Sequence, residues 1–185
     1  GGFDDIQTES IPLNGLLIAG VDDVVKETDG LIDAGYSSIK IKVARQPIER
    51  DVDIIQKEIQ RLPDNVNLRL AAHQPWTFDK ALSFCGRFDI DRIEYIEEPL
   101  ADPNDYTEFF SRIDVPVALD ESLVDHKPQS IPYIDNIEAF VLKPSLLGGL
   151  DSTTKLIRFA REKRIKPVIS CTFQTGFTIA VYALF

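Results

Sequence analysis

Two lysines lie on one face of a predicted strand. Segment 38–43 alternates apolar residues with Lys40 and Lys42, so a β-strand here places both lysines on the same side. The pattern by itself fits a solvated edge strand as well as it fits a pair of lysines facing an enclosed site. In an enclosed site, burial lowers the pKa of an ammonium group and makes the amine a usable base. The choice depends on what the other strands present.

Acidic residues follow two other apolar segments. Segment 96–99 reads IEEP and segment 118–122 reads ALDES, so Glu97 and Asp120 each end a predicted strand. The first pattern alone also fits a solvated loop with a helix-capping acid. Adjacent carboxylates repel unless a cation lies between them, and Mg²⁺ takes a few carboxylates together with water and substrate oxygens. Because adjacent carboxylates follow two predicted strands in succession, the sequence favours a metal site.

Further polar groups follow the later strands. Lys143 comes directly after an apolar segment, where a functional role is favoured because lysine is seldom buried without a partner. Gly148 and Gly149 precede a predicted helix and would offer free backbone N–H groups to an anion, although a plain turn fits equally well. Ser170 and Thr172 belong to a hydroxyl-rich strand end that either binds a carboxylate or caps the next helix.

Apolar periodicity predicts strands and helices in strict alternation, which is typical of a parallel sheet covered by helices. Residues 1–10 are expected to be a polar tail or a cut end, and segment 128–134 is only weakly helical. The strands are predicted at 11–19, 38–43, 67–72, 92–96, 116–119, 139–142 and 166–171, and the helices at 21–34, 47–62, 78–88, 104–113, 150–163 and 177–185.

The residues at the C-terminal ends of six predicted strands recur at intervals of 23 to 29 residues: positions 42, 71, 97, 120, 143 and 170. One βα unit has about that length, since eight units make a barrel of roughly 250 residues. The C-terminal ends of parallel strands form the rim at which α/β proteins bind ligands. The spacing therefore favours the functional interpretation of Lys40 and Lys42.

Composition excludes several classes of protein. The chain has 185 residues, 44% of them hydrophobic, and fits one globular domain. Its net charge of −10 argues against binding to nucleic acid or to an anionic membrane. No apolar run reaches the roughly 20 residues of a membrane span. The two cysteines, Cys85 and Cys171, form neither a CxxC motif nor a disulfide framework, so a reducing, cytoplasmic location is expected.

Four motifs in order resemble the enolase superfamily, and within it the o-succinylbenzoate synthase-like proteins of the muconate cycloisomerase-like group. They are K-x-K at 40–42, E-E-P at 97–99, A-L-D-E-S at 118–122 and L-K-P at 142–144. The resemblance implies a TIM-type (β/α) barrel with an α+β capping domain. Residues 11–185 would then be a partial barrel domain with about seven strands, lacking the capping domain and the last strand.

The resemblance also implies roles for the motif residues. Lys42 would be the base that removes the proton α to a carboxylate, with Lys40 lowering its pKa by charge repulsion. Lys143 would stabilise the anionic intermediate or act as a second acid or base. Glu97 and Asp120 would hold a Mg²⁺ ion that stabilises an enediolate.

The family's first metal ligand is missing. Where the family has an L-D-A-N motif, segment 70–73 reads LAAH, so Ala71 replaces the aspartate. Two carboxylates and water would bind Mg²⁺ more weakly. His73 faces the same side as position 71 by strand parity, and it would either form hydrogen bonds at the substrate site or bind a softer ion such as Mn²⁺ or Zn²⁺.

Three functions remain open at this stage. The first is a lyase that dehydrates a cyclohexadiene dicarboxylate to o-succinylbenzoate in menaquinone or phylloquinone biosynthesis. The second is a racemase of N-acylamino acids or an epimerase of dipeptides, with Lys42 and Lys143 as opposed bases. The third is an inactive homologue or fragment, because of Ala71. The expected partner is a small dicarboxylate substrate, and a homo-oligomer or a missing segment would complete the barrel.

Overall fold

The computed structural model describes residues 11–17, 24–125 and 127–183. Its described residues form one sheet of seven parallel strands, in the order in which they occur along the chain. This confirms the predicted fold class and the predicted number of strands. The strands are β1 (Gly15–Leu17), β2 (Ser38–Lys42), β3 (Asn67–Ala71), β4 (Ile93–Glu97), β5 (Val117–Leu119), β6 (Ile137–Leu142) and β7 (Lys166–Ile169).

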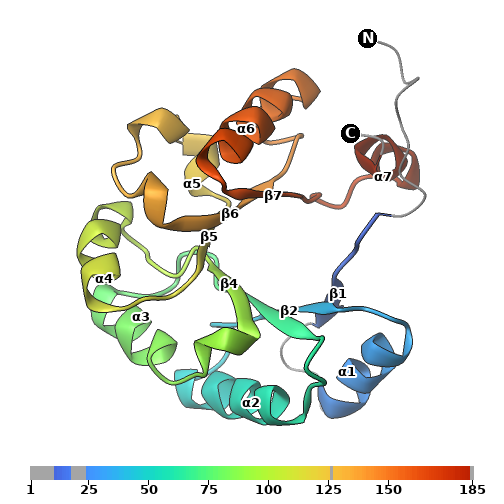
Figure 1. Cartoon of the computed structure of the whole chain (residues 1–185), viewed down its shortest axis with the longest axis vertical. Coiled ribbons are helices and arrows are strands. Elements are labelled where there is room, and N and C mark those ends of the chain that lie inside the picture. Colours follow the sequence, from blue (N-terminus) through green and yellow to red (C-terminus); the bar gives the residue numbers. More distant parts are fainter. Residues whose placement is uncertain (1–10, 18–23, 126, 184–185) are drawn as a thin grey trace.

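Helices connect the strands on the outside of the curved sheet (Figure 1). They are α1 (Val24–Asp33), α2 (Ile48–Arg61), α3 (Phe78–Cys85), α4 (Tyr106–Arg112), α5 (Ser122–Asp125), α6 (Leu150–Lys163) and α7 (Gly176–Ala183). The short helix α5 was not predicted, and segment 128–134 contains only 3-10 turns. The tail expected at 1–10 lies outside the described residues. So do the end of the strand predicted at 11–19, the start of the helix predicted at 21–34 and the last two residues of the helix predicted at 177–185.

Local sequence explains where these elements begin and end. Helix α2 carries apolar side chains at Ile48, Val52, Ile55 and Ile59, at the spacing of one helical face. It ends because Leu62 precedes a proline and adopts an extended backbone. Val52 and Ile55 belong to the main apolar core, which lies between the strands and the helices.

The inner face of the sheet has its own small apolar cluster, separate from the main core on the outer face. Its members are Tyr95, Ala118, Ala139 and Val141, with Val168 packed against them. Strands β1 and β7 each have one neighbour among the described residues, so the barrel is open between them. No described helix is both long and apolar enough to cross a membrane.

Strand register brings the predicted rim residues to one edge of the sheet. Lys42 is paired with Ala71, and Ala71 is paired with Glu97 on the next strand. Asp120 and Lys143 follow the last residues of β5 and β6. The spacing seen in the sequence therefore corresponds to one continuous rim.

Candidate active site

Two lysine–carboxylate ion pairs lie at this rim. The ammonium group of Lys40 donates to Oε2 of Glu97 at 2.6 Å, and that of Lys143 donates to Oδ2 of Asp120. The side chains of Glu97 and Asp120 are only 0% and 2% exposed, so both carboxylates depend on these lysines for charge compensation. The inner face of the half-barrel therefore contains the lysines and acids that the motifs identify.

Lys42 differs from the other two lysines because it has no hydrogen-bond or ion-pair partner in the described part of the chain. Burial lowers its pKa, and repulsion from Arg45, Lys40 and Lys143 lowers it further, against the attraction of Glu97. As predicted, the charge of Lys40 lowers the pKa of Lys42, but burial and the charge of Arg45 lower this pKa more. A lysine with a lowered pKa supplies more of the neutral amine that a base requires.

The pKa of Lys143 is shifted in the opposite direction, upward. Burial lowers its pKa, but the hydrogen bond and the charge of Asp120 outweigh burial and raise it overall. Burial together with repulsion from Glu97 and Glu121 raises the pKa of Asp120, and the Lys143 hydrogen bond opposes this rise. Lys143 is therefore held as a cation beside the acidic groups.

Glu98 follows β4 and connects the end of this strand to the end of β5. Its Oε1 accepts hydrogen bonds from the backbone N–H groups of Asp120 and Ser122, both at 2.8 Å, and its Oε2 accepts one from the Ser122 hydroxyl at 2.9 Å. The side chain is fully buried. Burial raises its pKa against the effect of these hydrogen bonds. Glu98 thus holds the backbone of Asp120 in place relative to Glu97.

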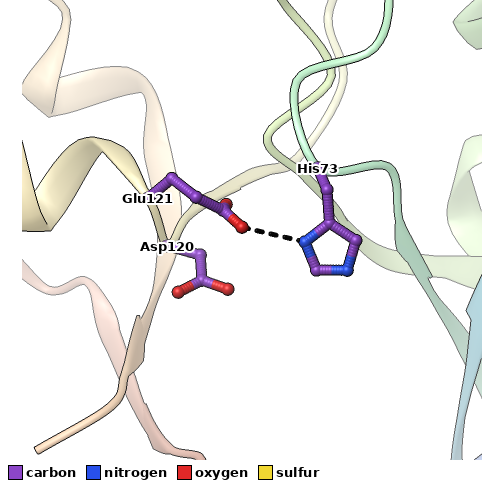
Figure 2. A group of neighbouring side chains, drawn as sticks. All are labelled: His73, Asp120 and Glu121. Atoms are coloured by element: carbon purple, nitrogen blue, oxygen red, sulfur yellow. Dashed lines mark hydrogen bonds and ion pairs between the residues drawn. The ribbon is translucent and has the colours of Figure 1, made fainter. Parts of the chain in front are cut away.

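His73 lies against Glu121, at the rim that Asp120 also lines. Nδ1 of His73 is 2.9 Å from Oε1 of Glu121, and Figure 2 shows the two side chains reaching toward one another with Asp120 below them. Strand β3 ends at Ala71, and both His73 and Gln74 have positive φ angles, 65° and 57°, so strand parity does not extend to His73 and its facing the same side as residue 71 stays a prediction. Its role in substrate binding stays a prediction.

Ala71 is completely buried between Lys42 and Glu97 in the sheet. Its methyl group donates and accepts no hydrogen bond, and Oε1 of Glu97 is buried without any partner in the described residues. A buried carboxylate oxygen without a partner is unfavourable, and a cation would satisfy it. The oxygen atoms of Glu97 and Asp120 therefore fit a divalent ion, although residue 71 contributes nothing to it.

Two of the residues predicted to bind a carboxylate, Gly149 and Thr172, already form hydrogen bonds within the protein. The N–H of Gly149 donates to the carbonyl oxygen of Pro144 at 2.8 Å, so the expectation of a free N–H there was wrong. The hydroxyl of Thr172 accepts a hydrogen bond from Gln174 at 2.6 Å and lies 3.0 Å from the hydroxyl of Ser145. Substrate binding by Gly148, Ser170 and Thr172 stays a prediction.

Backbone strain concentrates at this rim. Six described non-glycine residues have positive φ, and five of them follow β2, β3, β4 or β7: Ala44, His73, Gln74, Glu98 and Phe173. Such conformations are uncommon and cluster at functional sites. Their position agrees with a site on the C-terminal ends of the strands.

Sequence reasoning missed the structural role of Glu98 and the contact between His73 and Glu121. Glu98 follows the last residue of β4 and has a positive φ of 45°, so strand alternation does not apply to it and the E-E-P motif alone did not indicate its role. No sequence signal indicated that the turn after β3 would direct His73 toward Glu121.

Fold and site together define an α/β-barrel protein whose lysines and carboxylates meet at the C-terminal rim. The family model described as "Enolase C-terminal domain-like" matches residues 23–184. The chain therefore belongs to this family, within the enolase superfamily, and is o-succinylbenzoate synthase-like.

Individual relatives agree with this assignment. Protein PHYLLO, chloroplastic, from Arabidopsis thaliana is 31% identical over 161 residues, which are 84% of this chain and 9% of that protein. The o-succinylbenzoate synthase of Pasteurella multocida is 30% identical over 155 residues, which are 80% of this chain and 46% of that enzyme. The chain thus spans less than half of either relative.

A solved structure has the same fold. The o-succinylbenzoate synthase from Thermosynechococcus elongatus, complexed with magnesium in its active site, matches with a TM-score of 0.74 at 23% identity. The match covers 97% of this chain and 58% of the other.

Proposed function

We propose that this chain carries the catalytic rim of an o-succinylbenzoate synthase-type lyase, which removes water from a cyclohexadiene dicarboxylate in menaquinone or phylloquinone biosynthesis. The unequal states of two lysines support this proposal best. Lys42 has no partner among the described residues and a lowered pKa, whereas Lys143 is paired with Asp120 and has a raised pKa. Dehydration needs one base, but racemisation or epimerisation needs two opposed bases. One base and one fixed cation therefore favour the lyase.

The reaction would begin at Lys42. Its neutral amine removes the proton α to the substrate carboxylate, and the C–H electrons delocalise into that carboxylate. The ammonium group of Lys143 stabilises the resulting negative charge. The proton held by Lys42 then leaves with the departing hydroxyl as water, so the C–H and C–O bonds break and an aromatic ring forms. Lys42 returns to the neutral amine.

Glu97 and Asp120 would hold the divalent ion in this site. When bound, the ion supplies positive charge that favours the enediolate form of the carboxylate. The three lysines at the rim also provide local positive charge for a dianionic substrate, although the chain as a whole carries −10.

Incubation with the cyclohexadiene dicarboxylate and Mg²⁺ or Mn²⁺ tests the proposal. We expect o-succinylbenzoate, detected by liquid chromatography and mass spectrometry, from the chain and from the control variant Lys57→Ala. Lys57 is exposed and pairs only with Asp53 in the described structure. Lys42→Ala should form no product. Ala71→Asp restores the family ligand and should raise turnover.

Two results would contradict the lyase. Solvent deuterium entering the α position of an N-acylamino acid or a dipeptide, without dehydration of the dicarboxylate, would identify a racemase or epimerase. Absence of both reactions in Ala71→Asp while that variant binds Mg²⁺ would identify an inactive homologue.

A further inference from the structure

A nitrogen and two carboxylates converge beside the catalytic lysines. His73 follows β3, whereas Asp120 and Glu121 follow β5, yet one potential ligand atom from each lies within 4.8 Å of the others (Figure 2). Glu97 ends the strand between them, β4, and is not a member of this group. None of the four family motifs contains His73.

The distances within this group suit one ion. Ligand bonds to divalent cations are about 2.0 to 2.2 Å long, so two neighbouring ligands of an octahedral ion lie about 3 Å apart. The separation of 2.9 Å between Nδ1 of His73 and Oε1 of Glu121 matches that edge. Ligands on opposite sides of such an ion lie about 4.2 Å apart, which is within the spread of the group.

Two buried oxygen atoms give independent evidence for a missing partner. Oε1 of Glu97 and Oε2 of Glu121 are both inaccessible to solvent and have no hydrogen-bond partner in the described residues. The side chain of Glu97 is 0% exposed. The unsatisfied oxygen of Glu121 belongs to the group that lies within 4.8 Å, and that of Glu97 lies at the end of the neighbouring strand β4. A cation held by the group would satisfy the Glu121 oxygen.

The chain path explains how a histidine reaches this position. His73 and Gln74 have left-handed backbones, and the N–H of Gln74 donates to the carbonyl oxygen of Glu98 at 2.6 Å. That hydrogen bond fixes the turn after β3 to the end of β4. The imidazole of His73 lies against Glu121.

We propose that this chain binds its divalent cation in a displaced site, in which His73 supplies the ligand that Ala71 lacks and joins Asp120 and Glu121. A site with one imidazole nitrogen binds Mn²⁺ more strongly than Mg²⁺, in line with the order of affinities of divalent metals for nitrogen ligands. This inference rests on the proposed function and specifies which residues bind its metal ion. It concerns the ligands and not the substrate.

Pulsed electron paramagnetic resonance on the Mn²⁺-loaded chain tests the site without any activity measurement. We expect a ¹⁴N coupling to the ion that is replaced by a ¹⁵N coupling when the protein is labelled with ¹⁵N-histidine. His73→Asn should abolish the coupling and weaken Mn²⁺ binding by about 10-fold or more in calorimetry. Glu108→Gln removes an exposed carboxylate on α4 and should leave both unchanged.

Three results would overturn the inference: Mn²⁺ bound without histidine nitrogen coupling, coupling that persists in His73→Asn, or no binding at millimolar Mn²⁺. The sequence has a second histidine, His126, so the matched variant His126→Asn should keep the coupling, and its loss there would also overturn the inference. Formation of o-succinylbenzoate by a chain without nitrogen coupling would overturn this inference alone. Nitrogen coupling without dehydration or proton exchange would instead contradict only the proposed function.

Discussion

Glu98 provides the sharpest test of how the rim is held together. Its carboxylate is buried and accepts hydrogen bonds from two backbone N–H groups and the Ser122 hydroxyl, all within 2.8 to 2.9 Å. Longer hydrogen bonds come from Nε2 of Gln74 at 3.3 Å and from the Tyr106 hydroxyl at 3.5 Å. Glu98→Ala leaves the N–H groups of Asp120 and Ser122 without an acceptor. Glu98→Gln keeps one carbonyl oxygen in the place of Oε1, and the Ser122 hydroxyl can rotate to accept from the new amide.

The expected effects differ strongly between these two variants. Each buried donor left without an acceptor costs about 1 to 3 kcal/mol, so Glu98→Ala should lower the free energy of unfolding by about 4 kcal/mol. Glu98→Gln retains both backbone hydrogen bonds and no longer buries a charge, so its loss should be about 1 kcal/mol. The difference of about 3 kcal/mol corresponds to roughly 100-fold in the folding equilibrium.

Urea unfolding followed by tryptophan fluorescence measures these values. Trp76 is the single tryptophan in the sequence and is 5% exposed, so its emission reports the loss of the core. Glu108→Ala is the matched control, because Glu108 is exposed and its removal should change stability by no more than about 0.5 kcal/mol.

Two results would refute the reasoning. A loss below about 1 kcal/mol in Glu98→Ala would mean that the backbone donors find other partners, because buried unsatisfied donors are expensive. Equal losses in Glu98→Ala and Glu98→Gln would mean that negative charge, and not the acceptor oxygen, stabilises this connection.

Three further predictions concern the lysines and glycines. Lys40→Met leaves the buried Glu97 carboxylate unpaired and should lower the free energy of unfolding by about 3 kcal/mol, which the double variant with Glu97→Gln should largely restore in urea titrations. In the proposed mechanism Lys42 acts as the neutral amine, so proton-removal rates should rise with pH and level off above a pKa that lies below the ordinary lysine value; a falling rate would argue against this base. Gly149→Ala forces alanine to a φ of 96° and should cost about 2 kcal/mol in thermal unfolding, whereas Gly30→Ala in the open interior of α1 should stabilise by about 0.5 kcal/mol.

Much of the site could be predicted because parallel strands repeat at regular intervals. The intervals between Lys42, Ala71, Glu97, Asp120 and Lys143 placed these residues on successive strand ends, and the strand register from Lys42 to Glu97 confirms one rim. Alternation along β2 likewise separated the lysines from the buried Ile39 and Ile41. Helical and strand periods are local properties, and for that reason the sequence carries them.

The pairing of charges depended on the tertiary structure. Sequence indicated that Lys40 would act on Lys42, but the fold also joins Lys40 to Glu97 and places Arg45 where it lowers the pKa of Lys42 more strongly. Side chains at the same rim have several possible partners. Distances of a few ångströms across neighbouring strands decide among them.

The sequence by itself determined the barrel class, the order of the motifs and the absence of an acid at position 71. Only the tertiary structure decided where His73 lies relative to the acids of the rim. A left-handed turn after β3, fixed by a hydrogen bond from Gln74 to Glu98, directs His73 to Glu121. That turn depends on a backbone contact between two strands, which the local pattern of residues does not encode.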